Sequence, residues 1–128
     1  MKGDKGDMKF ESNAPIYLQV VDAIKLDIIN GKISPGQKLP SGRDLAVLYT
    51  INPNTSARVY QELEAQGICY TKRGMGTYAT EDLDRIKQCR DEMAEETLKK
   101  FLTSLNQLGI TKEEAIDMIN EANDICIL

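Results

Sequence analysis

The sequence contains no histidine. This absence excludes the imidazole base of general acid–base catalysis, the Ser-His and Cys-His nucleophile pairs, and zinc sites that depend on histidine. No paired-carboxylate motif and no nucleotide-binding loop takes its place. A small enzyme is therefore the least supported function, and we expect no catalytic residue, no metal site and no cofactor.

Cysteine is scarce, with Cys69, Cys89 and Cys126 alone in the chain. An odd number of widely spaced thiols argues against a framework of disulfide bonds. We expect all three to be small core or surface residues. A redox or metal-sensing role is the alternative.

Long apolar runs are missing as well. A helix that spans a bilayer needs roughly 20 apolar residues, and the runs here are only a few residues long. The opening MKGDKGDMKF has no apolar signal region. We expect a cytoplasmic protein with no membrane partner. Its 128 residues allow one compact core and a small appendage.

Acidic residues outnumber basic ones and give a net charge of −4, but the two kinds are unevenly distributed. Residues 8–80 carry eight Lys/Arg and six Asp/Glu, whereas residues 81–128 carry six and twelve. The acidic excess therefore lies in the last third of the chain. The first two-thirds are mildly basic, so the net charge does not exclude a nucleic-acid partner.

Turn and capping residues divide residues 10–80 into three helices and a hairpin. Pro15 and Gly31 bracket a first helix over about residues 15–30. Ser41 predicts the N-cap of a short second helix, and Asn52 that of a third helix ending before Gly67.

Two short strands, Ile68–Lys72 and Thr77–Thr80, are expected next, around a four-residue turn. Three helices and a hairpin, with a tight turn between the second and third helices, predict a winged helix-turn-helix. The fold class is mainly α with a small β-hairpin.

We expect residues 81–128 to form a two-helix tail and residues 1–9 to form a flexible N-terminus. A long helix over 83–108 stops at Gly109, and Thr111 with Glu114 forms the capping box of a last helix that carries Ile125. Two helices enclose little core alone, so their apolar stripe is expected to cover that of a second copy. The predicted dimerisation residues are Leu98, Phe101, Leu102, Leu105, Ile116 and Ile119.

One side of the third helix is polar but not acidic. At 100° per residue, Asn54, Ala57, Arg58, Gln61 and Ala65 share an arc of about 100°. Asn and Gln pair with adenine and Arg with guanine, while an Ala methyl fits a thymine methyl. This side predicts contact with base edges in the major groove. An ordinary solvated surface is the alternative.

The hairpin turn places two cations beside a glycine-rich tip. Gly74 and Gly76 let the backbone approach a minor groove, and Lys72 and Arg73 suit its phosphates. We interpret the turn as a wing, with a plain exposed turn as the alternative.

Together these motifs resemble the winged-helix domain of GntR-family transcriptional regulators over residues 15 to about 80. They are Pro-Gly-x-x-Leu-Pro-Ser-x-Arg-x-Leu-Ala, Asn-Pro-Asn-Thr, Tyr-x-x-Leu-x-x-x-Gly and Lys-Arg-Gly-x-Gly-Thr. The resemblance implies DNA contacts by Arg43, Asn54, Thr55 and Gly74. With the residue-based candidates, the predicted DNA-binding set is Ser41, Arg43, Asn54, Thr55, Ala57, Arg58, Gln61, Lys72, Arg73, Gly74 and Gly76.

The sequence departs from the family pattern at two positions. Gly42 replaces a larger residue, which weakens a helix if the position is interior and less so near the N-cap. Ala57 stands where relatives often carry Gln or Arg, which leaves the operator preference open. The short tail is similar to that of the YtrA-type subfamily, whose members often control transporter operons.

The leading hypothesis is a homodimeric repressor that binds a double-stranded DNA operator with an inverted repeat. Any small-molecule effector is unknown. A protein-interaction module that acts through the acidic tail is the alternative, and salt dependence separates the two because phosphate binding weakens steeply as salt rises.

Overall fold

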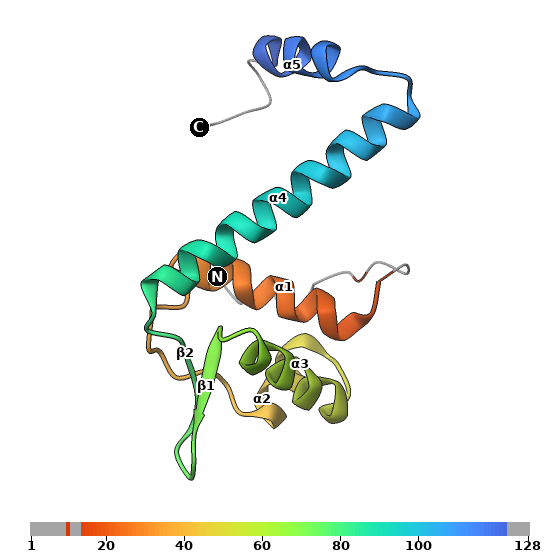
Figure 1. Ribbon diagram of the computed structural model, residues 1–128. Coiled ribbons are helices and arrows are strands. Elements are labelled where there is room, and N and C mark those ends of the chain that lie inside the picture. Colours follow the sequence, from red (N-terminus) through yellow and green to blue (C-terminus); the bar gives the residue numbers. More distant parts are fainter. Residues whose placement is uncertain (1–9, 11–13, 123–128) are drawn as a thin grey trace. The chain divides into compact units, whose positions relative to one another are not determined.

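The computed structural model describes residue 10 and residues 14–122 of the chain. Within them the protein is mainly α-helical with one two-stranded antiparallel sheet, as the sequence predicts (Figure 1). The elements are α1 (Ile16–Ile29), α2 (Gly42–Tyr49), α3 (Pro53–Ala65), β1 (Cys69–Lys72), β2 (Gly76–Ala79), α4 (Leu83–Gln107) and α5 (Lys112–Glu121). The predictions for residues 1–9, Ile125 and Cys126 lie outside the described residues.

Helices α2, α3 and α5 begin at the predicted capping residues. The Ser41 hydroxyl accepts the Asp44 N–H at 3.0 Å and starts α2. The Asn52 side chain starts α3, followed by a proline at the first helical position. At α5, Thr111 and Glu114 form the complete capping box. These caps satisfy N–H groups that have no partner inside the helix, so their residue types could be read from the sequence.

The chain divides into two compact units, which are residues 1–90 and residues 91–128. The predicted boundary lies earlier, at residue 80. The first turns of α4 belong to the first unit: Cys89 is 1% exposed, and Arg85 Nε donates a hydrogen bond to the Gln66 carbonyl at 2.7 Å. The assignment of DNA binding to the first part of the chain and of dimerisation to the tail stays a prediction.

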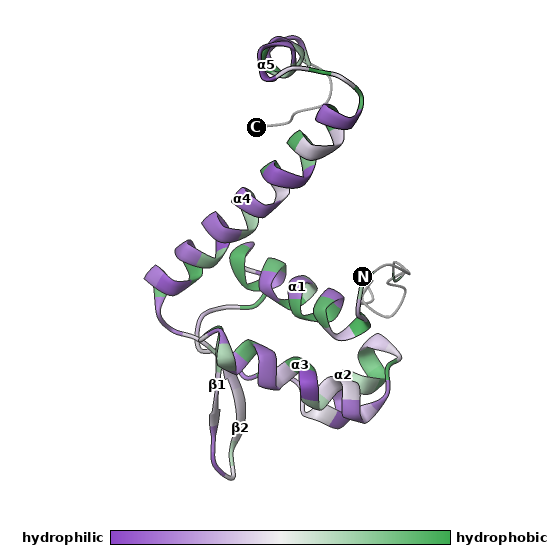
Figure 2. Cartoon of the chain, turned by 45° about the vertical axis from the view of Figure 1, so that its right-hand side comes forward, coloured by the Kyte–Doolittle hydropathy of each residue, from purple (hydrophilic) through white to green (hydrophobic). Residues whose placement is uncertain are grey.

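The core of the first unit is built around α3. Helices α1 and α2 both pack against it. From α1 come Val20, Val21, Ile24 and Ile28, each less than 5% exposed, and Figure 2 shows α1 as largely apolar along its length. Full burial of such a side chain contributes about 1.5–3 kcal/mol, so this stripe fixes the orientation of α3.

A buried hydroxyl ties α2 to α3. Ser56 is 0% exposed, and its Oγ donates a hydrogen bond to the Gly42 carbonyl at 2.6 Å. The turn between the two helices passes through Thr50, whose φ of 56° is left-handed. Gly42 is the first residue of α2, so the cost of a glycine there is smaller than in a helix interior.

The hairpin projects away from α1, and both views show its tip free of α1, α2 and α3 (Figures 1 and 2). Its register pairs Cys69 with Ala79 and Lys72 with Gly76. The turn therefore holds three residues, not the predicted four, because the Lys72 carbonyl accepts the Met75 N–H at 2.9 Å and draws Gly76 into the ladder.

A segment from the turn after α1 lies along the other edge of β2. Leu39 N–H donates to the Thr77 carbonyl at 2.8 Å, and Ala79 N–H donates to the Gln37 carbonyl at 2.9 Å. Lys38 forms a bridge with Tyr78 between these bonds. Both edges of β2 are thus paired, which anchors the base of the hairpin to the helical core.

Candidate nucleic-acid interface

The predicted outer side of α3 is exposed. Asn54, Ala57, Arg58 and Gln61 are all exposed to solvent, and the opposite side is buried. Ser56, Val59 and Leu63 are each 0% exposed, and Tyr60 is half-buried, as the helical period predicts. The structure leaves this amide- and arginine-bearing side open to a partner.

The N-terminus of α3 offers fewer free N–H groups than an uncapped helix. Pro53 has none, and the Asn54 N–H donates to the Asn52 side chain at 2.7 Å. The Thr55 N–H has no hydrogen-bond partner among the described residues. One backbone N–H and the half-buried Thr55 hydroxyl therefore remain for an anion here.

Arg58 does not extend freely into solvent. Its guanidinium carbon lies 3.9 Å from the centroid of the Tyr17 ring of α1, which is a cation–π contact. Sequence reasoning missed Tyr17, since 41 residues separate the two and no local pattern links them.

The C-terminal end of α3 is held by a hydrogen-bonded chain that sequence reasoning also missed. Lys25 Nζ, on a residue only 8% exposed, donates to Gln66 Oε1 at 2.8 Å. Gln66 Nε2 in turn donates to Glu62 Oε2 at 2.7 Å. A second acid of α3, Glu64, accepts a short hydrogen bond from Thr71 of β1. Both acids are therefore engaged within the protein.

The wing carries its cations at and beside the tip. Arg73, Gly74 and Met75 are exposed, and Gly74 has a φ of 76° that a glycine adopts without strain. Lys72 is placed differently, with its Nζ 4.9 Å from the Tyr78 ring centroid and 5.9 Å from that of Tyr70.

Lys38 is a cation near the wing that sequence reasoning did not select. A Cβ added at Gly76 would lie 2.8 Å from Lys38 Cε, which the flexible lysine side chain can relieve by shifting, whereas the φ of 123° at Gly76 itself favours glycine. Its backbone bridge to Tyr78 could not be foreseen from the turn signals of residues 34–40.

From α2, Ser41 and Arg43 are exposed. Arg43 borders a depression of about 530 Å³ around the α2–α3 turn, next to Val47, which is 76% exposed. Ser41 uses its oxygen to cap α2, and its hydroxyl proton stays available to donate.

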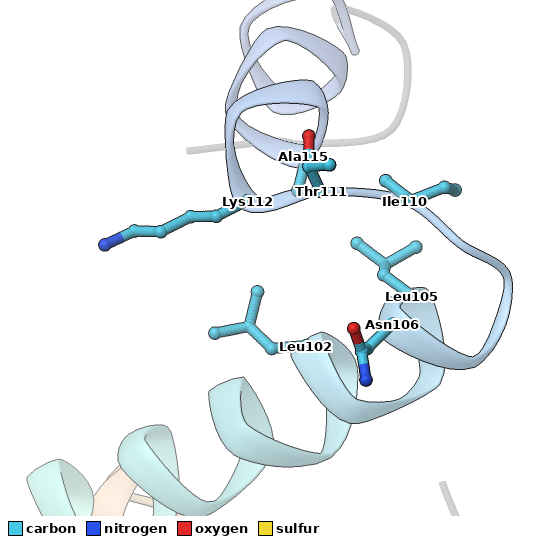
Figure 3. A pocket seen from close by; sticks show the side chains of 7 residues that line it. All are labelled: Leu102, Leu105, Asn106, Ile110, Thr111, Lys112 and Ala115. Atoms are coloured by element: carbon cyan, nitrogen blue, oxygen red, sulfur yellow. The ribbon is translucent and has the colours of Figure 1, made fainter.

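The predicted dimerisation residues fall into two groups in the second unit. Leu98, Phe101, Ile116 and Ile119 are 42–55% exposed, and we call them the tail face. Leu102 and Leu105 are half-buried and line a cavity of about 230 Å³ between α4 and α5, with Ile110 and Ala115 (Figure 3).

Three buried or half-buried groups in the first unit, one thiol and two tyrosine hydroxyls, have raised pKa values. Desolvation, followed by the charge of Glu64, raises the pKa of Cys69 to about 12. Desolvation and then Asp27 raise the pKa of Tyr49 to about 12. Desolvation also raises the pKa of Tyr60, whose hydroxyl donates to the Pro40 carbonyl. All three groups are neutral at physiological pH, and Cys69 is a packed residue rather than a reactive thiol.

Within residues 14–122, none of the helices has both the length and the apolar character needed to span a bilayer. The same residues contain no cluster of three or more Cys, Asp or Glu side chains suited to a metal ion.

Comparison with known proteins assigns the first unit to one family. The family described as bacterial regulatory proteins, gntR family, matches residues 16–79, which is half of the chain. The chain is 40% identical over 113 residues to the HTH-type transcriptional regulator YhcF of Bacillus subtilis, covering 88% of this chain and 93% of YhcF. It is 37% identical over 111 residues to the HTH-type transcriptional repressor YtrA of the same organism, covering 86% of this chain and 85% of YtrA.

Solved structures show the same architecture. A GntR family transcriptional regulator from Listeria monocytogenes superposes with a TM-score of 0.80 at 39% identity, covering 89% of this chain and all of that one. AraR(DBD), solved in complex with operator ORX1, superposes with a TM-score of 0.51 at 31% identity, covering 57% of this chain and 90% of that one.

Proposed function

The chain belongs to the GntR family of bacterial regulatory proteins, which are DNA-binding transcriptional regulators and not enzymes, and from this membership we propose that it is a homodimeric repressor of an inverted-repeat operator. The observation that carries the proposal is the exposed side of α3, with Asn54, Ala57, Arg58 and Gln61 open to solvent while the acids of the same helix are hydrogen-bonded within the protein.

Each part of the first unit has a role in the proposed complex. Arg58 and Gln61 read base edges in the major groove, where Arg favours guanine and Gln favours adenine. Asn54 and Thr55 hold the start of α3 against base and phosphate, with Arg43 and Ser41 of α2 on the neighbouring backbone. Ala57 allows close approach to the groove floor.

The wing binds beside this contact. Its predicted residues are Lys72, Arg73, Gly74 and Gly76. Arg73 and Gly74 at the exposed tip suit a narrow minor groove, whose negative potential attracts arginine. The ring-bound Lys72, held near Tyr78, suits a phosphate at its edge.

Dimerisation is proposed to occur through the second unit. Four large apolar side chains of the tail face are about half exposed, which favours a protein contact over solvent. A two-fold dimer requires an operator with two inverted half-sites, about 34–36 Å apart if they are one helical turn apart.

Repression, rather than activation, is supported by the name of the relative YtrA, a transcriptional repressor similar to this chain over most of both lengths. The resemblance to YtrA-type regulators also supports transporter genes as targets and the cytoplasm as the location.

The direct test is selection of bound sequences from a pool of random duplexes with the purified full chain. Enrichment of one inverted repeat supports the proposal, and binding must weaken steeply as salt rises, because counterions are released on phosphate contact. Binding of all duplexes with equal affinity overturns it.

The dimer is tested by a pair of matched substitutions in α4. Phe101→Glu places a charge on the tail face, whereas Thr103→Glu places the same charge about 160° away around the helix. In sedimentation equilibrium the wild type and Thr103→Glu are expected to be dimers and Phe101→Glu a monomer. Dimers in all three would exclude the tail face as the interface.

A further inference from the structure

We propose that Tyr17 of α1 is a positioning residue for DNA reading: its ring holds the Arg58 guanidinium in a fixed orientation before DNA arrives. The inference rests on the proposed function and adds a residue that contacts DNA only through Arg58. Its basis is the 3.9 Å separation between the guanidinium carbon and the ring centroid.

A guanidinium stacked on a ring keeps its hydrogen-bonding capacity. At 3.9 Å the cation lies over the negative face of the ring, and this contact uses none of the five N–H donors as a hydrogen bond. Arg58 is exposed, so this outward edge meets solvent in the free protein. The same edge is the one that would form a bidentate contact with guanine.

The ring has a rigid support. Tyr17 is half-buried and lies one turn before Val20 and Val21, which are 0% and 1% exposed and anchor α1 in the core. It therefore continues the buried stripe of α1 at its N-terminal end. A ring placed in this way moves with the core of the first unit.

A second contact fixes α3 against α1 eight residues further along. Lys25 Nζ donates to Gln66 Oε1 at 2.8 Å, and both pairs, Tyr17 with Arg58 and Lys25 with Gln66, are 41 residues apart in the chain. Because the partner's number rises together with the position on α1, α1 and α3 run in the same general direction. The orientation of Arg58 therefore depends both on the packing of α3 against α1 and on the contact of its own side chain with Tyr17.

Preorganisation matters because arginine is flexible. A free arginine must give up its rotamer freedom when it binds, whereas a stacked one has lost part of that freedom beforehand. Tyr17 thus raises the affinity of Arg58 for its base without touching DNA itself. The effect is confined to the sequence that Arg58 reads.

The test compares full-length wild type, Tyr17→Phe and Tyr17→Leu on two duplexes: the sequence selected by the wild type and a scrambled duplex of the same length. Tyr17→Phe keeps the ring and is expected to bind the selected duplex within twofold of wild type. Tyr17→Leu is expected to bind it roughly two- to tenfold more weakly, because the freed Arg58 side chain must then be ordered on binding, with unchanged affinity for the scrambled duplex.

A double-mutant cycle separates positioning from a general structural role. With Arg58→Ala already present, Tyr17→Leu should cause no further loss on the selected duplex, because there is no guanidinium left to orient. An equal loss on both duplexes, or a loss that persists in the Arg58→Ala background, overturns the proposal. So does a loss with Tyr17→Phe, which would show that the hydroxyl itself binds DNA.

Nuclear magnetic resonance tests the stack without DNA and covers the case in which Tyr17→Leu does not fold. The Arg58 Nε–H resonance is expected to be shifted upfield by the ring in the wild type and in Tyr17→Phe, and an unshifted resonance overturns the proposal. If the wild type selects no sequence at all, the proposed function itself fails, an outcome distinct from a selective wild type with unaffected Tyr17 variants.

Discussion

Arg58→Ala is the substitution whose effect on DNA binding the structure specifies most closely. Arg58 is exposed on the outer side of α3, and its guanidinium lies over the Tyr17 ring. Loss of a bidentate arginine–guanine contact costs about 1–3 kcal/mol. That range corresponds to a dissociation constant for the selected operator that is roughly 5- to 150-fold higher.

The stack on Tyr17 does not enter this difference. It is present in the free protein and is proposed to persist in the complex, so its loss cancels between the two states. It does enter folding, where removal of an exposed cation–π contact is expected to lower the free energy of unfolding by about 0.5–1 kcal/mol. The two quantities can be measured separately, by fluorescence anisotropy with labelled duplex and by urea unfolding.

Lys32→Ala is the matched control, because Lys32 is an exposed cation of the same unit outside the proposed interface. It removes one positive charge and is expected to leave the preference for the operator over a scrambled duplex unchanged. If Arg58→Ala weakens binding to the two duplexes by the same factor, Arg58 supplies charge and reads no base. If neither affinity changes, Arg58 lies off the interface and our assignment of the reading side of α3 is wrong.

The remaining predictions concern stability. Gly42→Ala should raise the free energy of unfolding, measured by urea titration, by roughly 0.5 kcal/mol. An added Cβ would lie 3.6 Å from the Ser56 hydroxyl, which is an ordinary contact, and alanine reduces the entropy of the unfolded chain. A decrease would mean that the close approach of α2 and α3 needs glycine. Tyr49→Phe should raise the free energy of unfolding by about 1 kcal/mol, since the buried Tyr49 hydroxyl has no hydrogen-bond partner among residue 10 and residues 14–122. A loss of stability would reveal a partner. The free energy of unfolding should also fall as pH rises above about 9, because the Cys69 thiol, with a pKa near 12 in the fold against 9.0 ordinarily, stays protonated there while the unfolded chain releases the proton. The full stability is present below about pH 9, and Cys69→Ala should reduce the decline between pH 9 and 10, below the range in which Tyr49 and Tyr60, whose pKa values are raised from 10.0, also contribute. An unchanged slope in that range would contradict the assignment.

Local signals in the sequence predicted the elements well because capping and turn chemistry depend on near neighbours. Ser41, Asn52 and Thr111 each cap the helix that they were predicted to start, and Gly31 takes the left-handed conformation expected after α1. The helical period of α3 also separated its buried side from its exposed side. These features need only a few residues of chain to be recognised.

Contacts between distant residues could not be foreseen. The stack of Arg58 on Tyr17 and the hydrogen bond from Lys25 to Gln66 each join residues 41 positions apart. The bridge between Lys38 and Tyr78 depends on how the turn after α1 meets β2, which is set by the packing of the whole first unit. Such contacts follow from tertiary packing, and no local pattern of residue types encodes them.

Methylation interference on the selected operator tests the central claim most directly. Dimethyl sulfate methylates guanine N7, an acceptor in the major groove that arginine is expected to contact. We expect methylated guanines in two half-sites to block wild-type binding, and Arg58→Ala to lose sensitivity at one symmetric pair of them. Binding that is indifferent to N7 methylation throughout the operator would show that the exposed side of α3 does not enter the major groove.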